Sequence, residues 1–155
     1  MAAWRAFLNA HAAAIGSIER ELAAERQLPL TSYDVLVALS EAPGNRLRMH
    51  ELADAVVLSR SGLTRLVDRL EADGLLARAR AGEDRRGAYA VLTDAGREAL
   101  RRAWPVYARG ISRHFSSLMN DDEVRAITAA LGRVYAAQRP PPAFPPVDAK
   151  GDDHA

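Results

Sequence analysis

The chain has 155 residues, 21 of them Lys or Arg and 20 Asp or Glu, and 48% of its residues are hydrophobic. This size and composition fit one globular domain and exclude a large multidomain enzyme. The chain has no cysteine, which excludes disulfide bonds, thiolate catalysis, cysteine-ligated zinc and a cysteine-based redox sensor.

Two amphipathic helices are predicted in the N-terminal part. Residues 2–26 carry apolar side chains at three- and four-residue steps, the spacing of one face of a helix. Pro29 ends this helix. Thr31, with Asp34 three residues later, is expected to cap a second helix that ends at Ala42-Pro43-Gly44. We interpret both helices as scaffold.

Two further helices, over residues 49–55 and 59–73, are predicted with a turn between them. Ser59 begins the second of these, and Asp73-Gly74 ends it with glycine as the left-handed cap. One face of this helix is apolar, and the opposite face is polar. The apolar positions are Leu63, Leu66, Val67 and Leu70, and the polar ones are Arg60, Ser61, Thr64, Arg65 and Asp68.

Beyond residue 74 the apolar period becomes that of strands. Residues 75–80 and 88–92 form a predicted hairpin whose tip, AGEDRRG, is charged and flanked by glycine. Thr93 caps a long helix that runs to residue 118, and Asn120 with Glu123 forms a capping box for a last helix ending near residue 138. The proline-rich residues 139–155 are expected to be disordered.

The order of these elements is that of a winged helix-turn-helix, within a mainly α (α+β) fold. Residues 46–102 hold 12 Arg against 9 Asp or Glu, whereas the rest of the chain holds 9 basic and 11 acidic residues. Arg suits forked contacts with phosphate and guanine. Codon bias would produce the same excess of Arg, so the count alone does not establish a nucleic-acid partner.

We expect double-stranded DNA to contact two segments. The helix over residues 59–73 supplies groups for the major groove, and its N-terminus attracts phosphate. The hairpin tip carries two adjacent guanidinium groups suited to the minor groove. The expected contacts are Ser59, Arg60, Ser61, Thr64 and Arg65 as readers, Arg69 as a phosphate contact, and Arg85 and Arg86 at the tip, with Asp84 orienting one of them.

The run LADAVVLSRSGLTRLVDRLEADGLL together with DRRGAYAVLTDAG resembles the MarR family of bacterial transcriptional regulators, and the likeness covers nearly the whole chain. It implies residues 1–138 as one domain, with N-terminal helices (1–44), a winged helix-turn-helix (45–92) and C-terminal dimerisation helices (93–138). It also implies an obligate homodimer whose winged domains read a palindromic operator, and repression relieved by a ligand. By this resemblance, DNA is contacted by the predicted readers of the helix over residues 59–73, called the reading helix below, and by Arg86 at the hairpin tip, which Asp84 holds in position. Peroxide sensors of the family need a reactive Cys in the first helix, which this chain lacks.

The terminal helices give an independent reason to expect a homodimer. They carry apolar stripes with little core in the same chain to cover them. The alternative is that the stripes pack on the long helix, which has Trp104, Ile111, Phe115 and Leu118. The stripes are Trp4, Phe7 and Leu8 at one end, and Val124, Ile127, Leu131, Val134 and Tyr135 at the other.

The family likeness places an effector pocket between the dimerisation helices and the winged domain. A small aromatic or phenolic effector could stack against aromatic residues of these segments, although each of them is also a candidate for the ordinary core. The candidate residues are Trp4, His11, Tyr33, Trp104, Tyr107 and His114.

Other classes of function are less well supported. The four His have no paired ligand spacing, and no catalytic motif is present, so neither a metal, a cofactor nor an enzyme activity is expected. A winged helix used as a protein-interaction module would need an apolar outer face, which the polar reading helix lacks. No apolar run reaches the roughly 20 residues of a membrane span, and the N-terminus does not resemble a secretory signal, so a cytoplasmic protein is expected.

Overall fold

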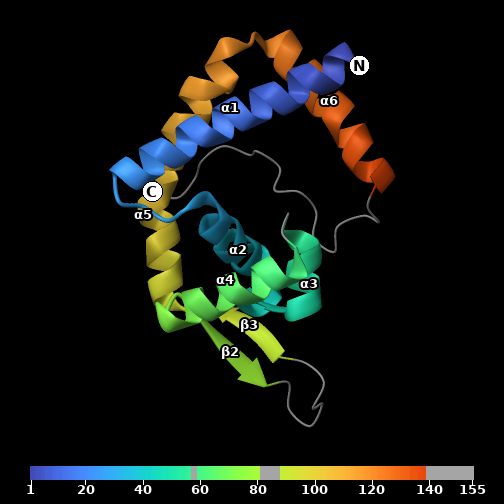
Figure 1. Cartoon of the computed structure of the whole chain (residues 1–155). Coiled ribbons are helices and arrows are strands. Elements are labelled where there is room, and N and C mark those ends of the chain that lie inside the picture. Colours follow the sequence, from blue (N-terminus) through green and yellow to red (C-terminus); the bar gives the residue numbers. More distant parts are fainter. Residues whose placement is uncertain (57–58, 81–87, 139–155) are drawn as a thin grey trace. The chain divides into compact units, whose positions relative to one another are not determined.

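The computed structural model describes residues 1–56, 59–80 and 88–138, with Arg60 and Arg80 described by their backbone alone. The chain divides into two units, residues 1–120 and residues 121–155, which we describe separately. The first unit contains helices and a three-stranded antiparallel sheet, which lies at one end of the unit (Figure 1). The elements are α1 (Ala2–Ala24), α2 (Leu30–Glu41), β1 (Arg46–Arg48), α3 (Met49–Ala55), α4 (Arg60–Ala72), β2 (Leu76–Arg80), β3 (Ala88–Leu92), α5 (Asp94–His114) and α6 (Asp121–Gln138). The mainly helical winged fold predicted from the sequence is confirmed.

Helix α1 is buried only in its C-terminal half. Ile18 and Leu22 are 3% and 1% exposed and pack in a cluster with Ala103 and Val106 of α5. Residues 1–13 are all exposed. The helix ends two residues earlier than predicted, and Arg26 follows with φ 53°. The apolar stripe of the first turns therefore has no core to cover it within this unit.

The predicted cap of the second helix was wrong. Helix α2 begins at Leu30 with Pro29 as its N-cap, and no side chain caps it. The Pro29 carbonyl accepts hydrogen bonds from the Ser32 and Tyr33 amides at 2.9 and 3.0 Å. Leu30 is only 6% exposed, so the core contact begins the helix one residue before Thr31.

The sheet contains a strand that the sequence did not reveal. Strand β1 pairs with β3, with Leu47 opposite Ala90, and the order across the sheet is β1-β3-β2. Leu47 and Ala90 are 3% and 0% exposed, so this face of the sheet adds to the core. Three residues are too few to show the alternation by which strands are recognised.

The long helix α5 is shorter than predicted. Thr93 caps it as expected, since its Oγ1 accepts a hydrogen bond from the Gly96 amide at 3.1 Å. The helix stops at His114 because Phe115 leaves the helical region, with φ −141° and ψ −73°. Ser116–Leu118 then form one short 3-10 turn instead of continuing the helix.

The described part of the second unit is helix α6, which matches the predicted position of the last helix. Asp121, Asp122 and Glu123 occupy its first turn, where negative charge is favoured by the helix dipole. None of its residues is buried, and Val134 and Tyr135 are 60% and 49% exposed. Residues 139–155, predicted to be a disordered tail, lie outside the described residues.

Candidate nucleic-acid interface

Helix α4 has the two faces predicted for a reading helix. Its apolar face is buried: Leu63, Val67 and Leu70 are 2%, 0% and 1% exposed. Ser59 forms the N-cap and its Oγ accepts a hydrogen bond from the Gly62 amide at 3.2 Å. This bond satisfies one of the free amides at the start of the helix and fixes where the reading face begins.

The opposite face of α4 is polar and exposed. It presents Ser61, Thr64, Arg65, Asp68 and Arg69 to solvent. Within residues 1–56, 59–80 and 88–138, neither Arg65 nor Arg69 makes an ion pair. The side chain of Arg60 lies outside what the structure describes. The two described arginines of this face are therefore available for an anionic partner.

The end of α4 leads directly into the sheet. Gly74 adopts φ 72°, the left-handed conformation that was predicted for it. The Gly74 amide donates to the Glu71 carbonyl at 3.0 Å and the Leu75 amide to the Leu70 carbonyl at 2.9 Å. These two bonds satisfy carbonyl groups that the helix end leaves free. Strand β2 begins at the next residue, Leu76.

An ion-pair cluster that the sequence analysis missed connects α4 to β2. Arg78 Nη2 lies 2.5 Å from Asp68 Oδ1, and its Nη1 lies 2.6 Å from Glu71 Oε2. The Arg78 amide also donates to Glu71 Oε1 at 3.0 Å. The hydrogen bond to Asp68 is the largest cause that raises the pKa of Arg78, and the hydrogen bond to Glu71 adds to it. Burial acts in the opposite direction. No local pattern predicts this cluster, because it depends on where β2 passes α4.

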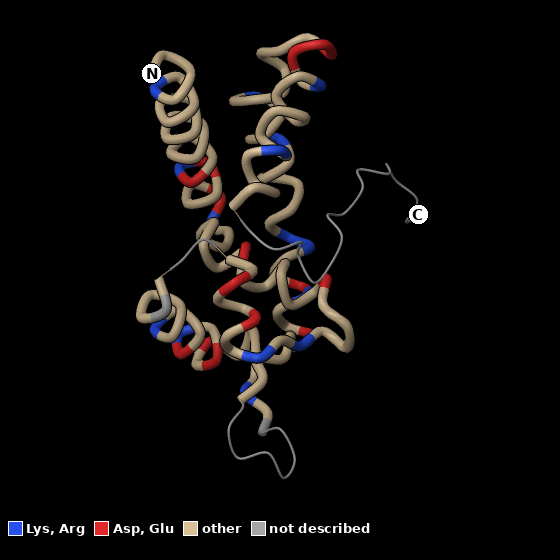
Figure 2. Tube along the Cα trace, turned by 90° about the vertical axis from the view of Figure 1, so that its right-hand side faces the viewer, with Lys and Arg blue, Asp and Glu red and all other residues tan. Residues whose placement is uncertain are grey.

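The outer face of the sheet carries a second group that was not predicted. The guanidinium groups of Arg46 and Arg48 lie 5.1 and 5.3 Å from the centroid of the Tyr89 ring. Arg48 Nε also donates to the Tyr89 hydroxyl at 3.2 Å. These contacts follow from the register, in which Arg48 lies opposite Tyr89. Basic and acidic residues lie interspersed in this part of the chain (Figure 2).

The hairpin has the predicted strands. Leu76 pairs with Leu92 and Arg80 with Ala88, so β2 and β3 are paired along their whole length. The predicted tip contacts, Asp84, Arg85 and Arg86, lie outside the described residues. Their role stays a prediction from the sequence.

The six candidate effector residues fall into three separate groups of contacts. The ring centroids of Tyr33 and Tyr107 lie 4.9 Å apart in an edge-on contact, and the Trp104 ring centroid lies 6.3 Å from that of Tyr107. Trp4 and His11 instead lie on either side of Phe7 along α1. Burial, and then the proximity of Tyr107, Asp34 and Glu41, raises the pKa of Tyr33 to about 12. Tyr33 is a core residue, 8% exposed, whereas Trp104 is 53% exposed.

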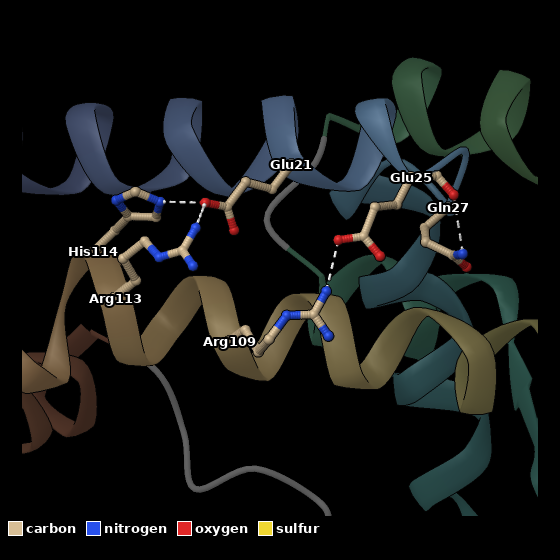
Figure 3. Close-up of polar contacts among 6 residues, drawn as sticks. All are labelled: Glu21, Glu25, Gln27, Arg109, Arg113 and His114. Atoms are coloured by element: carbon tan, nitrogen blue, oxygen red, sulfur yellow. Dashed lines mark hydrogen bonds and ion pairs between the residues drawn. The ribbon is translucent and has the colours of Figure 1, made fainter.

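His114 belongs to an ion-pair seam between α1 and α5 (Figure 3). Its Nε2 and the Nη1 of Arg113 each lie 2.9 Å from Glu21 Oε1, and Arg109 Nη2 lies 2.6 Å from Glu25 Oε1. The hydrogen bond with His114 is the largest cause that lowers the pKa of Glu21, and Arg113 adds to it. The partner of His114 is therefore a carboxylate of this seam.

A shallow hollow of about 240 Å³ lies between the loop that joins α1 to α2 and helix α5, beside Leu75. None of the six candidate effector residues lines it. Its lining residues are Arg26, Gln27, Leu28, Pro29, Leu75, Ala99 and Arg102. Among the described residues, no three His, Asp or Glu side chains are grouped as ligands for a metal ion. In that same part of the chain, no helix has the length and apolar character needed to cross a membrane.

Comparison with known proteins gives consistent matches. A family model described as MarR family matches residues 26–87. The crystal structure of AbsC, a MarR family transcriptional regulator from Streptomyces coelicolor, is similar with a TM-score of 0.80 and 33% identity, over 89% of this chain and 93% of AbsC. Sco3205 from the same organism is a MarR family transcriptional regulator whose structure was solved in complex with DNA. It is similar with a TM-score of 0.81 and 31% identity, over 89% of this chain and 86% of Sco3205.

A curated relative is the uncharacterized HTH-type transcriptional regulator YkoM of Bacillus subtilis, which is 34% identical over 80 residues. This match covers 52% of the present chain and 52% of YkoM, so the chain spans about half the length of that relative.

Proposed function

Since this chain belongs to the MarR family of transcriptional regulators, we propose that it is a repressor that binds a palindromic operator as a homodimer and is released by a small ligand. The observation that carries the proposal is the exposed polar face of α4 with two unpaired arginines. The similarity to Sco3205, whose structure contains DNA, supports the same surface as the one that meets DNA. Because a regulator of this kind acts on chromosomal DNA, the proposal includes a cytoplasmic location.

The residues of α4 divide into two roles. The readers of base edges in the major groove are Ser59, Arg60, Ser61, Thr64 and Arg65. Arg69 contacts phosphate, and the free amides at the helix start also favour phosphate.

The predicted hairpin-tip contacts complete the interface. Arg85 and Arg86 enter the minor groove, and Asp84 orients one of them. This assignment rests on the sequence pattern and on the resemblance to the family.

Dimerisation is supported by apolar side chains on both units. Trp4 and Leu8 of α1 are 58% and 44% exposed, and Val134 of α6 is 60% exposed. A second copy of the chain would bury these stripes. Two-fold symmetry then spaces the two reading helices about 34 to 36 Å apart, one turn of the duplex, and explains a palindromic operator.

A small aromatic or phenolic effector relieves repression by binding among the aromatic residues of α1 and α5. Trp104 is the strongest described candidate because it is half exposed and its ring meets that of Tyr107 edge-on. Trp4 and His11 of α1 form the second group. Tyr33 and His114 contribute indirectly, through Tyr107 and Glu21 respectively.

A DNA-binding titration tests the proposal. The purified protein is titrated onto its own upstream intergenic DNA at two salt concentrations, with a scrambled duplex as control. We expect the intergenic fragment to be preferred by orders of magnitude, with an affinity that falls as salt rises and a footprint over an inverted repeat. Equal affinity for both duplexes, together with a monomeric mass, would refute the proposal and favour a protein-interaction module.

A further inference from the structure

The DNA-facing side of α4 carries negative as well as positive charge. Asp68 lies three residues after Arg65 and directly before Arg69, and its side chain is 56% exposed. Glu71 follows one turn later, 37% exposed. Carboxylates at these positions would repel the phosphates of a bound duplex, and Asp68 has the spacing to pair with Arg65.

Elsewhere in this chain, acidic and basic residues three or four positions apart on a helix do pair. Asp94 pairs with Arg97 at 3.4 Å, and Asp122 with Arg125 at 2.5 Å. Glu98 pairs with both Arg101 and Arg102.

Arg65 and Asp68 have the three-residue spacing, yet Asp68 pairs with Arg78 of β2 instead. Glu71 pairs with the same guanidinium group, so one side chain occupies both carboxylates. With Asp68 paired to Arg78, Arg65 makes no ion pair with any of the described residues.

We propose that Arg78 is a positioning residue of the DNA-binding helix, which neutralises Asp68 and Glu71 and thereby keeps Arg65 available for DNA. Arg78 itself does not contact DNA. This inference rests on the proposed function, because it assigns Arg78 a role only if α4 meets a duplex. Without Arg78, the two carboxylates would face phosphate unscreened, and Asp68 could draw Arg65 into an ion pair.

The test uses three variants, measured by titration onto the preferred DNA fragment. Arg78→Gln exposes both carboxylates and should weaken binding on the order of 10-fold. Asp68→Asn with Glu71→Gln removes the carboxylates and should leave the affinity at or above that of the unmodified protein. All three substitutions together should restore the affinity to within about threefold of the unmodified protein, since there is no longer a carboxylate to neutralise.

Two controls separate this local effect from a change of net charge. Arg101→Gln removes another ion-paired arginine, 79% exposed on α5, and should change the affinity less than threefold. Arg78→Gln combined with Glu98→Gln and Asp122→Asn has the same net charge as the restored triple variant, but its substituted carboxylates lie on α5 and α6. It should bind as weakly as Arg78→Gln alone.

The alternatives give different patterns. If Arg78 contacts phosphate directly, the triple variant stays as weak as Arg78→Gln. If the cluster only holds β2 in place, the Asp68→Asn/Glu71→Gln variant is as weak as Arg78→Gln. The Asp68→Asn/Glu71→Gln variant also tests the inference if Arg78→Gln does not fold. Either pattern overturns the inference while DNA binding by the unmodified protein stands. Failure of the unmodified protein to prefer its DNA would instead refute the proposed function.

Discussion

Gly96 lies in the first turn of α5, where the helix passes against the segment that joins α4 to β2. A methyl group added at Gly96 would lie 2.1 Å from the Leu75 carbonyl oxygen and 2.7 Å from Leu92 Cδ1. Contacts below 3.0 Å essentially do not occur, so the backbone would have to move by about 0.9 Å. The Gly96→Ala variant therefore tests how tightly the winged region and α5 are packed together.

The expected sign is opposite to that of an ordinary helix substitution. Gly→Ala within a helix normally stabilises by up to about 1 kcal/mol. Overpacking against a rigid neighbour costs about 1 to 3 kcal/mol, and disturbing the Thr93 cap, which accepts from the Gly96 amide at 3.1 Å, costs about 0.5 to 2 kcal/mol more. With helix propensity offsetting up to about 1 kcal/mol of these costs, we expect Gly96→Ala to lower the free energy of unfolding by about 0.5 to 5 kcal/mol.

Urea unfolding followed by circular dichroism at a fixed protein concentration measures this change. Gly16→Ala is the matched control, because its added methyl group would meet only the far end of the Arg20 side chain, at 3.6 Å. That variant should be as stable as the unmodified protein or more stable, by up to about 1 kcal/mol. A Gly96→Ala protein that matches or exceeds the stability of the unmodified protein would refute the packing argument.

Four further outcomes are expected. Arg65→Ala should cost about 1 to 3 kcal/mol of binding on the preferred DNA and little on a random duplex, if Arg65 reads a base; an equal loss on both in a competition assay would make it a backbone contact. Arg86→Ala should weaken binding to every sequence and reduce the slope of log affinity against log salt by about 0.9, whereas an unchanged slope would remove it from the interface. Because the pKa of Tyr33 is raised to about 12, stability should fall as pH rises from 10, where an unfolded tyrosine ionises. Burial raises the pKa of Tyr107 as well, so ultraviolet titration should show two late-ionising phenols, of which Tyr33→Phe removes one; two late phenols in that variant would assign the shift to another tyrosine. Because His114, and after it Arg113, lower the pKa of Glu21 below its ordinary 4.5, the contacts of Glu21 with these two residues should stabilise the protein above that pH and lose this effect as pH falls through the lowered value. Glu21→Gln should flatten the acid limb of a stability profile, and an identical limb would exclude Glu21 as its origin.

The reading helix shows how much of the candidate site could be predicted from the sequence. The apolar period of Leu63, Val67 and Leu70 placed its buried side correctly, and Ser59 and Gly74 marked both of its ends. These features depend on residues within a few positions of one another, and such contacts form in any context where the helix forms.

The wrong predictions concern positions where packing overrides a local preference. Thr31 is a good capping residue, but Leu30 is drawn into the core and Pro29 becomes the cap. The pattern after His114 favoured a continuous helix, but the backbone breaks at Phe115. The six effector candidates, all on plausible helical faces, are divided between core contacts, an exposed stripe and the His114–Glu21 seam.

The sequence by itself determined the order of the helices and the hairpin, the two faces of α4 and the likeness to the family, because periodicity and caps are local properties of the chain. Only the tertiary structure decided that β1 completes the sheet beside β3 and that Arg78 pairs with Asp68 and Glu71. Strand β1 joins β3 across more than 40 positions of sequence, as in the Arg48–Tyr89 contact. Arg78 meets Asp68 only because the turn at Gly74 carries β2 back along α4. Which long-range partner a side chain finds depends on the path of the backbone between them, and no pattern within a single element records it.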